Sequence, residues 1–272
     1  MQLVEANGAR IPLIGLGTWD LRGRVCARVV EQALRLGYRH IDTAQAYDNE
    51  REVGEGLRGA GVKRDEVFVT TKVWPSHFAP RELERSTKDS LAKLRLSEVD
   101  LLLLHWPSQQ IPLSETMGAL CRMKQMGFAR HIGVSNFTVA LVEEAVRLAT
   151  EPLVANQIEY HVYLDQSKVI AACRRHGLAI TAYCPIARGR AGSDDVLKRI
   201  GTAHGKTASQ VALRWLVQQN VIVIPRTSKV ERLSENFAIF DFVLTPGEMA
   251  EIGGLARPKG RLVNVSVAPE WD

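Results

Sequence analysis

The stretch Gly37–Glu50, GYRHIDTAQAYDNE, contains a short β-rich run, a loop and the start of a helix. The β-rich run ends on the carboxylate of Asp42, and Tyr47 lies in the loop that follows. Asn49 and Glu52 have the spacing of a helix N-cap and its reciprocal acceptor. The stretch therefore predicts a strand that leads into a helix, with an acidic and a phenolic side chain at the junction.

Two later β-rich runs also end on an ionisable residue. The run 67–72 ends at Lys72, and the run 99–105 ends at His105. In a parallel barrel the carboxyl ends of all strands lie on one face. The sequence therefore predicts that a carboxylate, a tyrosine, a lysine and a histidine converge at one site.

Strand-like and helical segments alternate along the whole chain, which favours a parallel sheet because parallel neighbours need crossover connections. Eight such units in 272 residues predict an α/β fold that closes into a (β/α)8 TIM barrel. No GxGxxG follows the first strand, which argues against a dinucleotide-binding open sheet. The expected helices are 25–36, 50–60, one from Pro80, 114–127 and one from Thr138. The expected strands are 13–16, 39–42, 67–72, 99–105, 132–135, 156–159, 179–183 and 221–225.

Composition limits the class of protein. With 46% hydrophobic residues and no linker or low-complexity tract, residues 1–272 are expected to form a single domain. The net charge of +5 comes from basic residues interleaved with acidic ones, so nucleic-acid binding is not expected. The N-terminus has no signal-peptide pattern and no apolar run is long enough to span a bilayer. Four cysteines without CxxC spacing predict buried thiols in a reducing cytoplasm: Cys26, Cys121, Cys173 and Cys184.

The four convergent residues suit protonation of an oxygen atom. A tyrosine ionises near pH 10, and a neighbouring Lys72 ammonium is expected to lower the pKa of Tyr47. Asp42 offsets the cost of burying that ammonium, and His105 is placed to donate a hydrogen bond to a carbonyl oxygen. No metal-ligand spacing and no serine or cysteine paired with a base is present in the sequence. Hydride transfer from a nicotinamide is the reaction that remains, although Lys72 could also form the Schiff base of an aldolase.

Three segments carry a resemblance to a known family. Gly37–Glu50, Arg130–Phe137 and Ile224–Asn236 are similar, in this order, to the three signatures of the aldo-keto reductases. The length and the ending APEWD, residues 268–272, most resemble the bacterial 2,5-diketo-D-gluconate reductases. The resemblance implies a catalytic tetrad of Asp42, Tyr47, Lys72 and His105. It also implies that a hairpin around Asn7-Gly8 closes the barrel floor.

The resemblance implies NADPH/NADP+ as cofactor. Ser228 and Glu231 have capping-box spacing, so a helix is expected to start at Ser228 and to offer its free amides to the 2′-phosphate, together with Arg226 and Arg232. The family's stacking tyrosine corresponds to Tyr183. The full set of expected cofactor-binding residues is Gly17, Thr18, Trp19, Asp42, Ser135, Asn136, Gln157, Tyr183, Ile186, Gly189, Ile224, Arg226, Thr227, Ser228, Arg232, Glu235 and Asn236.

The resemblance also implies an aromatic pocket for a small-molecule carbonyl substrate. The tail of this chain after its last expected helix is short, which predicts an open pocket with little apolar wall. A cytoplasmic monomer that contacts neither membrane nor nucleic acid is expected. The expected substrate-binding residues are Trp19, Tyr47, Trp74, His105 and Trp106.

The sequence thus predicts NADPH-dependent reduction of small aldehydes, ketones and α-dicarbonyls, such as methylglyoxal or 2,5-diketo-D-gluconate. Two other classes remain open at this level. One is a nucleotide-sensing regulatory subunit, in which cofactor binding controls a partner. The other is a metal-dependent barrel hydrolase or a Schiff-base aldolase that uses Lys72.

Overall fold

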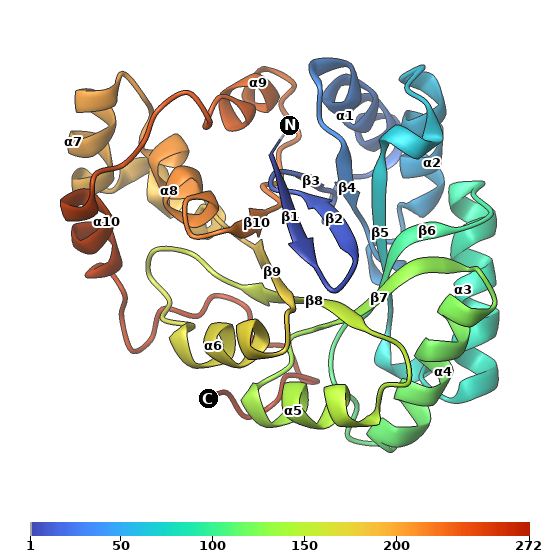
Figure 1. The fold of residues 1–272 in the computed structure, drawn as a ribbon. Coiled ribbons are helices and arrows are strands. Elements are labelled where there is room, and N and C mark those ends of the chain that lie inside the picture. Colours follow the sequence, from blue (N-terminus) through green and yellow to red (C-terminus); the bar gives the residue numbers. More distant parts are fainter. Residues whose placement is uncertain (1) are drawn as a thin grey trace.

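The computed structural model describes residues 2–272, which form a barrel of eight parallel strands surrounded by helices (Figure 1). The strands are hydrogen-bonded in sequence order, and a parallel bridge joins Ile14, just before the first strand, to Val223 in the last. Gly15 N–H donates to Val223 O at 2.9 Å, and Val223 N–H donates to Leu13 O at 2.9 Å. The sheet is therefore closed, as predicted. The strands are β3 (Leu16–Gly17), β4 (His40–Asp42), β5 (Phe68–Val73), β6 (Val99–Leu104), β7 (Ala129–Ser135), β8 (Leu153–Glu159), β9 (Ala179–Tyr183) and β10 (Val221–Val223).

Helices follow the barrel strands and cover the outside of the barrel (Figure 1). The first helix ends where Gly37 adopts a left-handed conformation with φ of 110°, which a residue without Cβ accepts readily. The α-helices are α1 (Gly23–Leu36), α2 (Glu50–Gly59), α3 (Pro80–Leu94), α4 (Leu113–Gln125), α5 (Val139–Leu148), α6 (Ser167–Arg175), α7 (Asp195–His204), α8 (Ala208–Val217), α9 (Glu231–Phe237) and α10 (Pro246–Gly253). The short 3-10 segments are η1 (Gln45–Tyr47), η2 (Arg64–Glu66), η3 (Pro75–His77) and η4 (Ala187–Ser193). No helix within residues 2–272 is long and apolar enough to cross a membrane.

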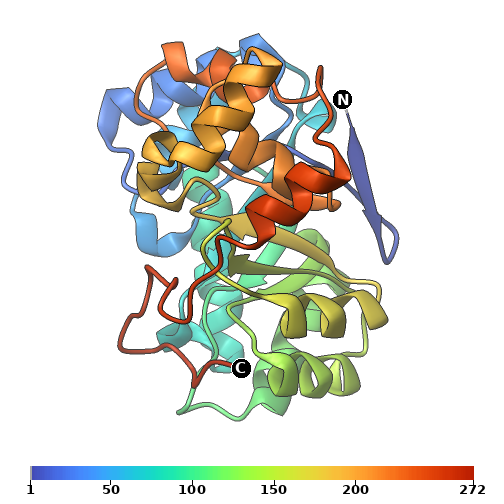
Figure 2. The same ribbon diagram turned by 90° about the vertical axis from the view of Figure 1, so that its left-hand side faces the viewer.

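An antiparallel hairpin precedes the barrel, formed by β1 (Leu3–Ala6) and β2 (Ala9–Pro12). Asn7 and Gly8 both have positive φ, 44° and 88°, as the predicted two-residue turn requires. Its buried side chains pack with Phe68 and other apolar residues of the barrel interior. The hairpin covers the end of the barrel opposite the C-terminal tail (Figure 2). The barrel is therefore filled at its floor, and its strand C-termini face the other way.

Asn49 corrects one expectation. It stands at the N-cap position of α2, but its side chain makes no capping hydrogen bond. Its amide instead donates to Thr18 O at 2.8 Å and Leu21 O at 3.0 Å, while Thr43 Oγ1 donates to Asn49 Oδ1 at 2.8 Å. Burial makes these long-range partners necessary, since an unpaired buried amide is costly. Asn49 thus joins the loop after β3 to the loop after β4.

Two helical glycines differ in the space around them. A Cβ on Gly56 in α2 would lie 2.5 Å from Ala27 O and 2.7 Å from Val30 Cβ, whereas a Cβ on Gly118 in α4 would meet nothing within 4 Å. We expect Gly56→Ala to lower the free energy of unfolding by about 1–3 kcal/mol, because helices α1 and α2 must move apart. Gly118→Ala, the matched control, should raise it by about 0.5–1 kcal/mol. Denaturant unfolding of both variants measures the difference, and equal effects would contradict the close packing of α1 on α2.

Candidate active site

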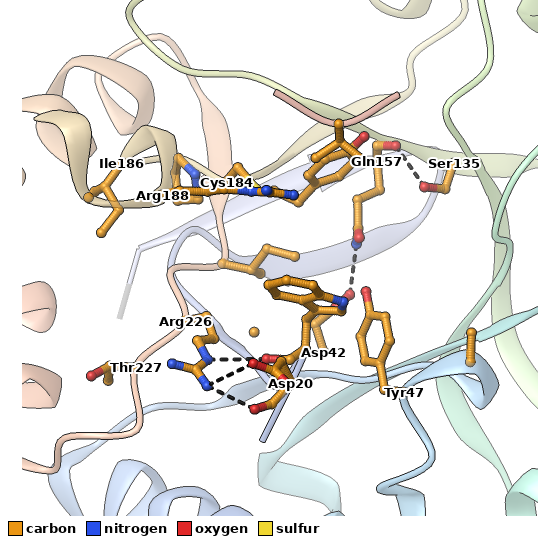
Figure 3. Close-up of a pocket in the computed structure, with 18 of the residues that line it drawn as sticks. Asp20, Asp42, Tyr47, Ser135, Gln157, Cys184, Ile186, Arg188, Arg226 and Thr227 are labelled. Carbon is orange, nitrogen blue, oxygen red and sulfur yellow. Dashed lines mark hydrogen bonds and ion pairs between the residues drawn. The ribbon is translucent and has the colours of Figure 1, made fainter. Parts of the chain in front are cut away.

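A cavity with a volume of about 780 Å³ opens at the carboxyl ends of the barrel strands. It extends from Tyr47, Trp74 and His105 at one end to Arg226 and Arg232 at the other. Figure 3 shows Tyr47 and Asp42 on one side of it and the segment from Cys184 to Arg188 on the other. Strand-end residues far apart in the sequence therefore share one elongated space.

A buried ion pair lies beside this cavity. Lys72 Nζ donates to Asp42 Oδ1 at 2.6 Å, to Thr43 O at 2.8 Å and to the hydroxyl of Tyr47 at 3.2 Å. Gln157 Nε2 donates to the other carboxylate oxygen of Asp42 at 2.7 Å (Figure 3). Lys72 is fully buried and does not line the cavity, but two of its partners, Asp42 and Tyr47, do.

The electrostatics of the pair correct the expected ionisation of the tyrosine. Burial, followed by the charges of Asp42 and Cys184, raises the pKa of Tyr47 well above its ordinary value. Burial also lowers the pKa of Lys72, and Asp42 opposes that change. Burial and the Asp42 carboxylate thus outweigh the lowering that was expected from the ammonium. Tyr47 consequently keeps its proton at neutral pH and has it available for donation.

His105 is held neutral next to this group. Burial, with a smaller effect from the Lys72 ammonium, lowers the pKa of His105 well below its ordinary value. Its ring stands edge-on to Tyr47, with ring centroids 5.6 Å apart, and to Trp74, at 5.2 Å. A neutral imidazole has one N–H donor and one acceptor. His105 can therefore offer a hydrogen bond to an uncharged carbonyl oxygen without adding a second cation.

Side chains from three neighbouring strands form a connected polar wall along the cavity. Ser135 Oγ donates to Gln157 O at 2.8 Å, and Asn136 Nδ2 donates to Ser135 Oγ at 3.1 Å. The hydroxyl of Tyr183 donates to Asn136 Oδ1 at 2.7 Å. Asn136 adopts a left-handed φ of 62°, a conformation that asparagine accepts more readily than most residues. The wall can bind a flat amide group through its side-chain amides and hydroxyls.

The distal end of the cavity differs from the prediction. Helix α9 begins at Glu231 with Val230 as its N-cap, and no side chain caps it, so the expected capping box of Ser228 and Glu231 does not form. Thr227 Oγ1 instead accepts from Lys229 N–H at 3.0 Å, which turns the chain before the helix begins. Ser228 lines the cavity, and its side chain does not cap α9.

Two expected cofactor residues lie outside the cavity wall. Thr18 is buried and its hydroxyl donates to Asp42 O at 2.9 Å, so it supports the strand end. The Glu235 carboxylate accepts from Thr207 Oγ1 at 2.8 Å. The other predicted residues, with the exception of Lys72, line the cavity: Gly17, Trp19, Asp42, Tyr47, Trp74, His105, Trp106, Ser135, Asn136, Gln157, Tyr183, Ile186, Gly189, Ile224, Arg226, Thr227, Ser228, Arg232 and Asn236.

Several cavity residues have no clear local signal in the sequence. Cys184 is half-buried, unlike the other three cysteines, and follows β9 directly into the cavity wall. Val263 and Val265 come from the C-terminal tail, so the tail is part of the wall, contrary to expectation. Val263 and Val265 are two positions apart, and in an extended chain this spacing places both side chains on one face. The remaining unpredicted lining residues are Asp20, Ala46, Pro185, Arg188, Ser209 and Lys229.

Comparisons with known proteins agree with this geometry. The Aldo/keto reductase family pattern matches residues 13–257. This chain belongs to the aldo/keto reductase family. The methylglyoxal reductase DkgB of Escherichia coli O157:H7 is 41% identical over 265 residues, which cover 96% of this chain and 99% of that protein. The methylglyoxal reductase DkgB of Yersinia pestis is 38% identical over 265 residues, which also cover 96% of this chain and 99% of that protein.

Solved structures of other aldo/keto reductases show the same fold. The crystal structure of a proposed 2,5-diketo-D-gluconic acid reductase B has a TM-score of 0.98 and 52% identity, covering 100% of this chain and 98% of that one. The aldose reductase of Schistosoma japonicum has a TM-score of 0.91 and 32% identity, and the match covers 95% of this chain and 94% of that one. The family resemblance and the barrel expected from the sequence are confirmed, and the chain is an oxidoreductase of the family that reduces carbonyl groups.

The buried pair of this aldo/keto reductase gives a stability prediction. Asp42→Asn and Lys72→Met should each lower the free energy of unfolding by about 3–5 kcal/mol, because each leaves its partner's charge buried without a counter-charge. The double variant should lose less than the sum of the two, since it removes both charges. Denaturant unfolding of the four proteins measures the coupling. Additive losses would show that the two charges do not depend on each other.

Proposed function

We propose that this chain reduces small aldehydes, ketones and α-dicarbonyls to alcohols with NADPH, with Tyr47 as the proton donor. The observation that carries the proposal is the chain of contacts from Asp42 through Lys72 to the hydroxyl of Tyr47 at the cavity wall. A reduced nicotinamide supplies a hydride when bound. The protein must then provide a proton for the carbonyl oxygen and a site that orients the carbonyl group.

The proposed roles follow from protonation states. The raised pKa of Tyr47 keeps a proton on the phenol, and an oxygen that gains negative charge accepts it. Lys72 then stabilises the phenolate that remains, and Asp42 and Gln157 keep Lys72 and its counter-charge in place. His105 orients the carbonyl oxygen toward the phenol as a neutral donor. Electrostatic stabilisation of this kind is strongest where water is excluded.

The shape and polarity of the cavity support a dinucleotide. Near the tetrad, Ser135, Asn136 and Gln157 offer the hydroxyl and amide groups that a nicotinamide carboxamide needs, and Tyr183 lies beside them. The distal end is lined by cationic Arg226, Lys229 and Arg232, which suit a phosphate. Gly17 lines the cavity as well and allows the segment after β10 to approach β3 closely, because a Cβ there would lie 2.6 Å from Ile224 O. The residues present therefore fit NADPH.

The two distal arginines have different surroundings. Arg226 Nη2 donates to Asp20 O at 2.8 Å and its Nε to Trp19 O at 3.2 Å, so it holds the loop after β3 (Figure 3). The Arg232 side chain makes no hydrogen bond or ion pair with other residues of 2–272. Arg232 is therefore the guanidinium that is free to bind a 2′-phosphate, whereas Arg226 shapes the site for either cofactor.

The substrate side supports a small carbonyl compound. Trp19, Trp74 and Trp106 line the cavity around the tetrad, and Val263 and Val265 add an apolar wall from the tail. The tail thus makes the substrate site narrower than the open pocket that the sequence predicted. The names of the similar proteins, a methylglyoxal reductase and a 2,5-diketo-D-gluconic acid reductase, agree with this class. Adjacent carbonyl groups activate each other toward hydride, so a site with few polar contacts can still reduce them.

The Schiff-base alternative is disfavoured by the position of Lys72. Its ammonium is fully buried, donates to three oxygens and does not line the cavity. A lysine that attacks a carbonyl must reach the substrate with a free amine. Borohydride trapping with methylglyoxal should therefore leave Lys72 unmodified.

Tyr47→Phe should lower kcat for methylglyoxal reduction by about 10²–10⁴-fold, because it removes the proton donor. NADPH binding should change little, since the ring remains. Tyr160→Phe is the matched control, because Tyr160 does not line the cavity and its hydroxyl has only a 3.5 Å contact with Gln219. Absorbance of NADPH followed under single-turnover conditions measures both variants. Retention of more than a tenth of the rate in Tyr47→Phe would contradict the assignment, and wild-type cofactor binding without any turnover would favour a nucleotide-sensing subunit.

Arg232→Ala should weaken NADPH binding by about tenfold or more and leave NADH binding unchanged, because its partner is a phosphate that NADH lacks. Arg226→Ala should weaken both cofactors, since it releases the loop of Trp19 and Asp20. Quenching of tryptophan fluorescence gives Kd for each pair. An equal loss of NADPH and NADH affinity in Arg232→Ala would place the 2′-phosphate elsewhere.

A further inference from the structure

A second buried carboxylate lies at the end of β8, outside the proposed catalytic set. Glu159 is fully buried and accepts three N–H groups: His161 Nε2 at 3.0 Å, Leu262 N at 2.6 Å and Val263 N at 2.9 Å. Two of the three donors belong to the C-terminal tail. A buried carboxylate is stable only with such donors, so the tail completes the site of Glu159.

The orientation of His161 fits this arrangement. Its Nδ1 accepts from Tyr163 N–H at 3.3 Å, which places the proton of a neutral ring on Nε2, toward Glu159. The ring is fully buried. The barrel therefore supplies one donor to the carboxylate and leaves its remaining oxygen positions for the two tail amides.

Other contacts fasten the tail on either side of Glu159. Arg257 N–H donates to Tyr163 O at 3.0 Å before the anchor. After it, the Arg261 guanidinium lies 3.5 Å from the ring centroid of Trp271, and that ring stands edge-on to Trp106 with a centroid separation of 6.1 Å. At the end of the chain, Asp272 Oδ2 accepts from Val139 N–H at 2.9 Å. The tail thus crosses the cavity side of the barrel (Figure 2).

The anchored segment forms part of the cavity. Val263, whose amide binds Glu159, lines the cavity, and so does Val265 two residues later. Glu159 pairs with Tyr183 across β8 and β9, and Gln157, on the same face of β8, binds Asp42. One strand therefore supports both the tetrad and the apolar wall of the tail.

We propose that Glu159, oriented by His161, is a positioning residue that sets substrate selectivity by holding Val263 and Val265 against the cavity. The proposal rests on the proposed reductase function for its kinetic readout, but the position of the tail can be measured without it. Release of the tail removes an apolar wall, so it weakens the binding of small carbonyl compounds and admits larger ones. It leaves the tetrad intact, because Glu159 makes no hydrogen bond to Asp42, Tyr47, Lys72 or His105.

The test uses the full chain with Glu159→Gln, in which an amide N–H group faces one of the tail N–H groups. Trypsin cleavage after Lys259, an exposed residue before the anchor, should become about tenfold faster, because a hydrogen bond to a charged group is lost. KM for methylglyoxal should rise with little change in kcat, and kcat/KM for a bulky aromatic aldehyde should rise relative to that for methylglyoxal. Kd for NADPH should stay the same.

Glu248→Gln is the matched control. Glu248 also accepts from a histidine, His204, and from a backbone amide, Thr245 N–H, but it lies in α10 and does not line the cavity. It should change neither tail cleavage nor selectivity. Leu262→Pro removes the closest tail donor without altering the barrel, and it should reproduce the faster cleavage. In the double variant Glu159→Gln/Val265→Ala, the rise in KM should be smaller than the product of the single effects.

Unchanged tail cleavage and selectivity in both Glu159→Gln and Leu262→Pro would overturn the proposal. So would a loss of kcat at constant KM in Glu159→Gln, since the carboxylate would then act on the reaction itself. If Glu159→Gln does not fold, the cleavage result for Leu262→Pro decides alone. Absence of turnover in the wild-type protein would refute the reductase function, while the cleavage comparison would still test the anchor.

Discussion

The buried ion pair of Lys72 and Asp42 is the constraint on which the rest of the site depends. A lysine ammonium inside the barrel is stable only because Asp42, Thr43 O and the Tyr47 hydroxyl receive all three of its protons. These partners come from β4 and the loop that follows it, so the position of β4 relative to β5 is fixed by charge as well as by strand pairing. The same interaction fixes the orientation of the tyrosine hydroxyl at the cavity wall.

Barrel closure brings the remaining parts of the site within reach of this pair. Gln157 on β8 crosses the barrel to bind Asp42, although the two residues are 115 positions apart in the chain. Such a contact requires a closed sheet, because the strands that carry these residues are not neighbours in it. The hairpin of β1 and β2 packs at the opposite end of the barrel, so apolar contacts fill one end and polar groups gather at the other. Stability and chemistry are thus separated along the barrel axis.

The cavity wall is completed by segments that have no regular secondary structure of their own. The loop after β3 is held by Asn49 and Arg226, and the tail is held by Glu159. In each case a side chain from the barrel or from an adjoining loop binds backbone groups of the segment, which satisfies donors or acceptors that no strand or helix pairs. Loops fastened in this way keep a defined surface toward the cavity while the barrel itself stays unchanged.

The sequence by itself determined the alternation of strands and helices, the approximate positions of the eight strands, the hairpin at Asn7 and Gly8, and the ionisable residues at the strand ends; the first strand, expected at 13–16, lies at Leu16–Gly17. These features depend on hydrophobic periodicity and turn chemistry, which act over a few residues. Where local spacing suggested caps at Asn49 and Ser228, tertiary structure decided otherwise, because burial gave Asn49 distant partners and the chain turned at Thr227 instead. The protonation of Tyr47 and the placement of the tail on Glu159 were also tertiary outcomes. Burial, net local charge and contacts between residues more than a hundred positions apart set them, and no short stretch of sequence contains that information.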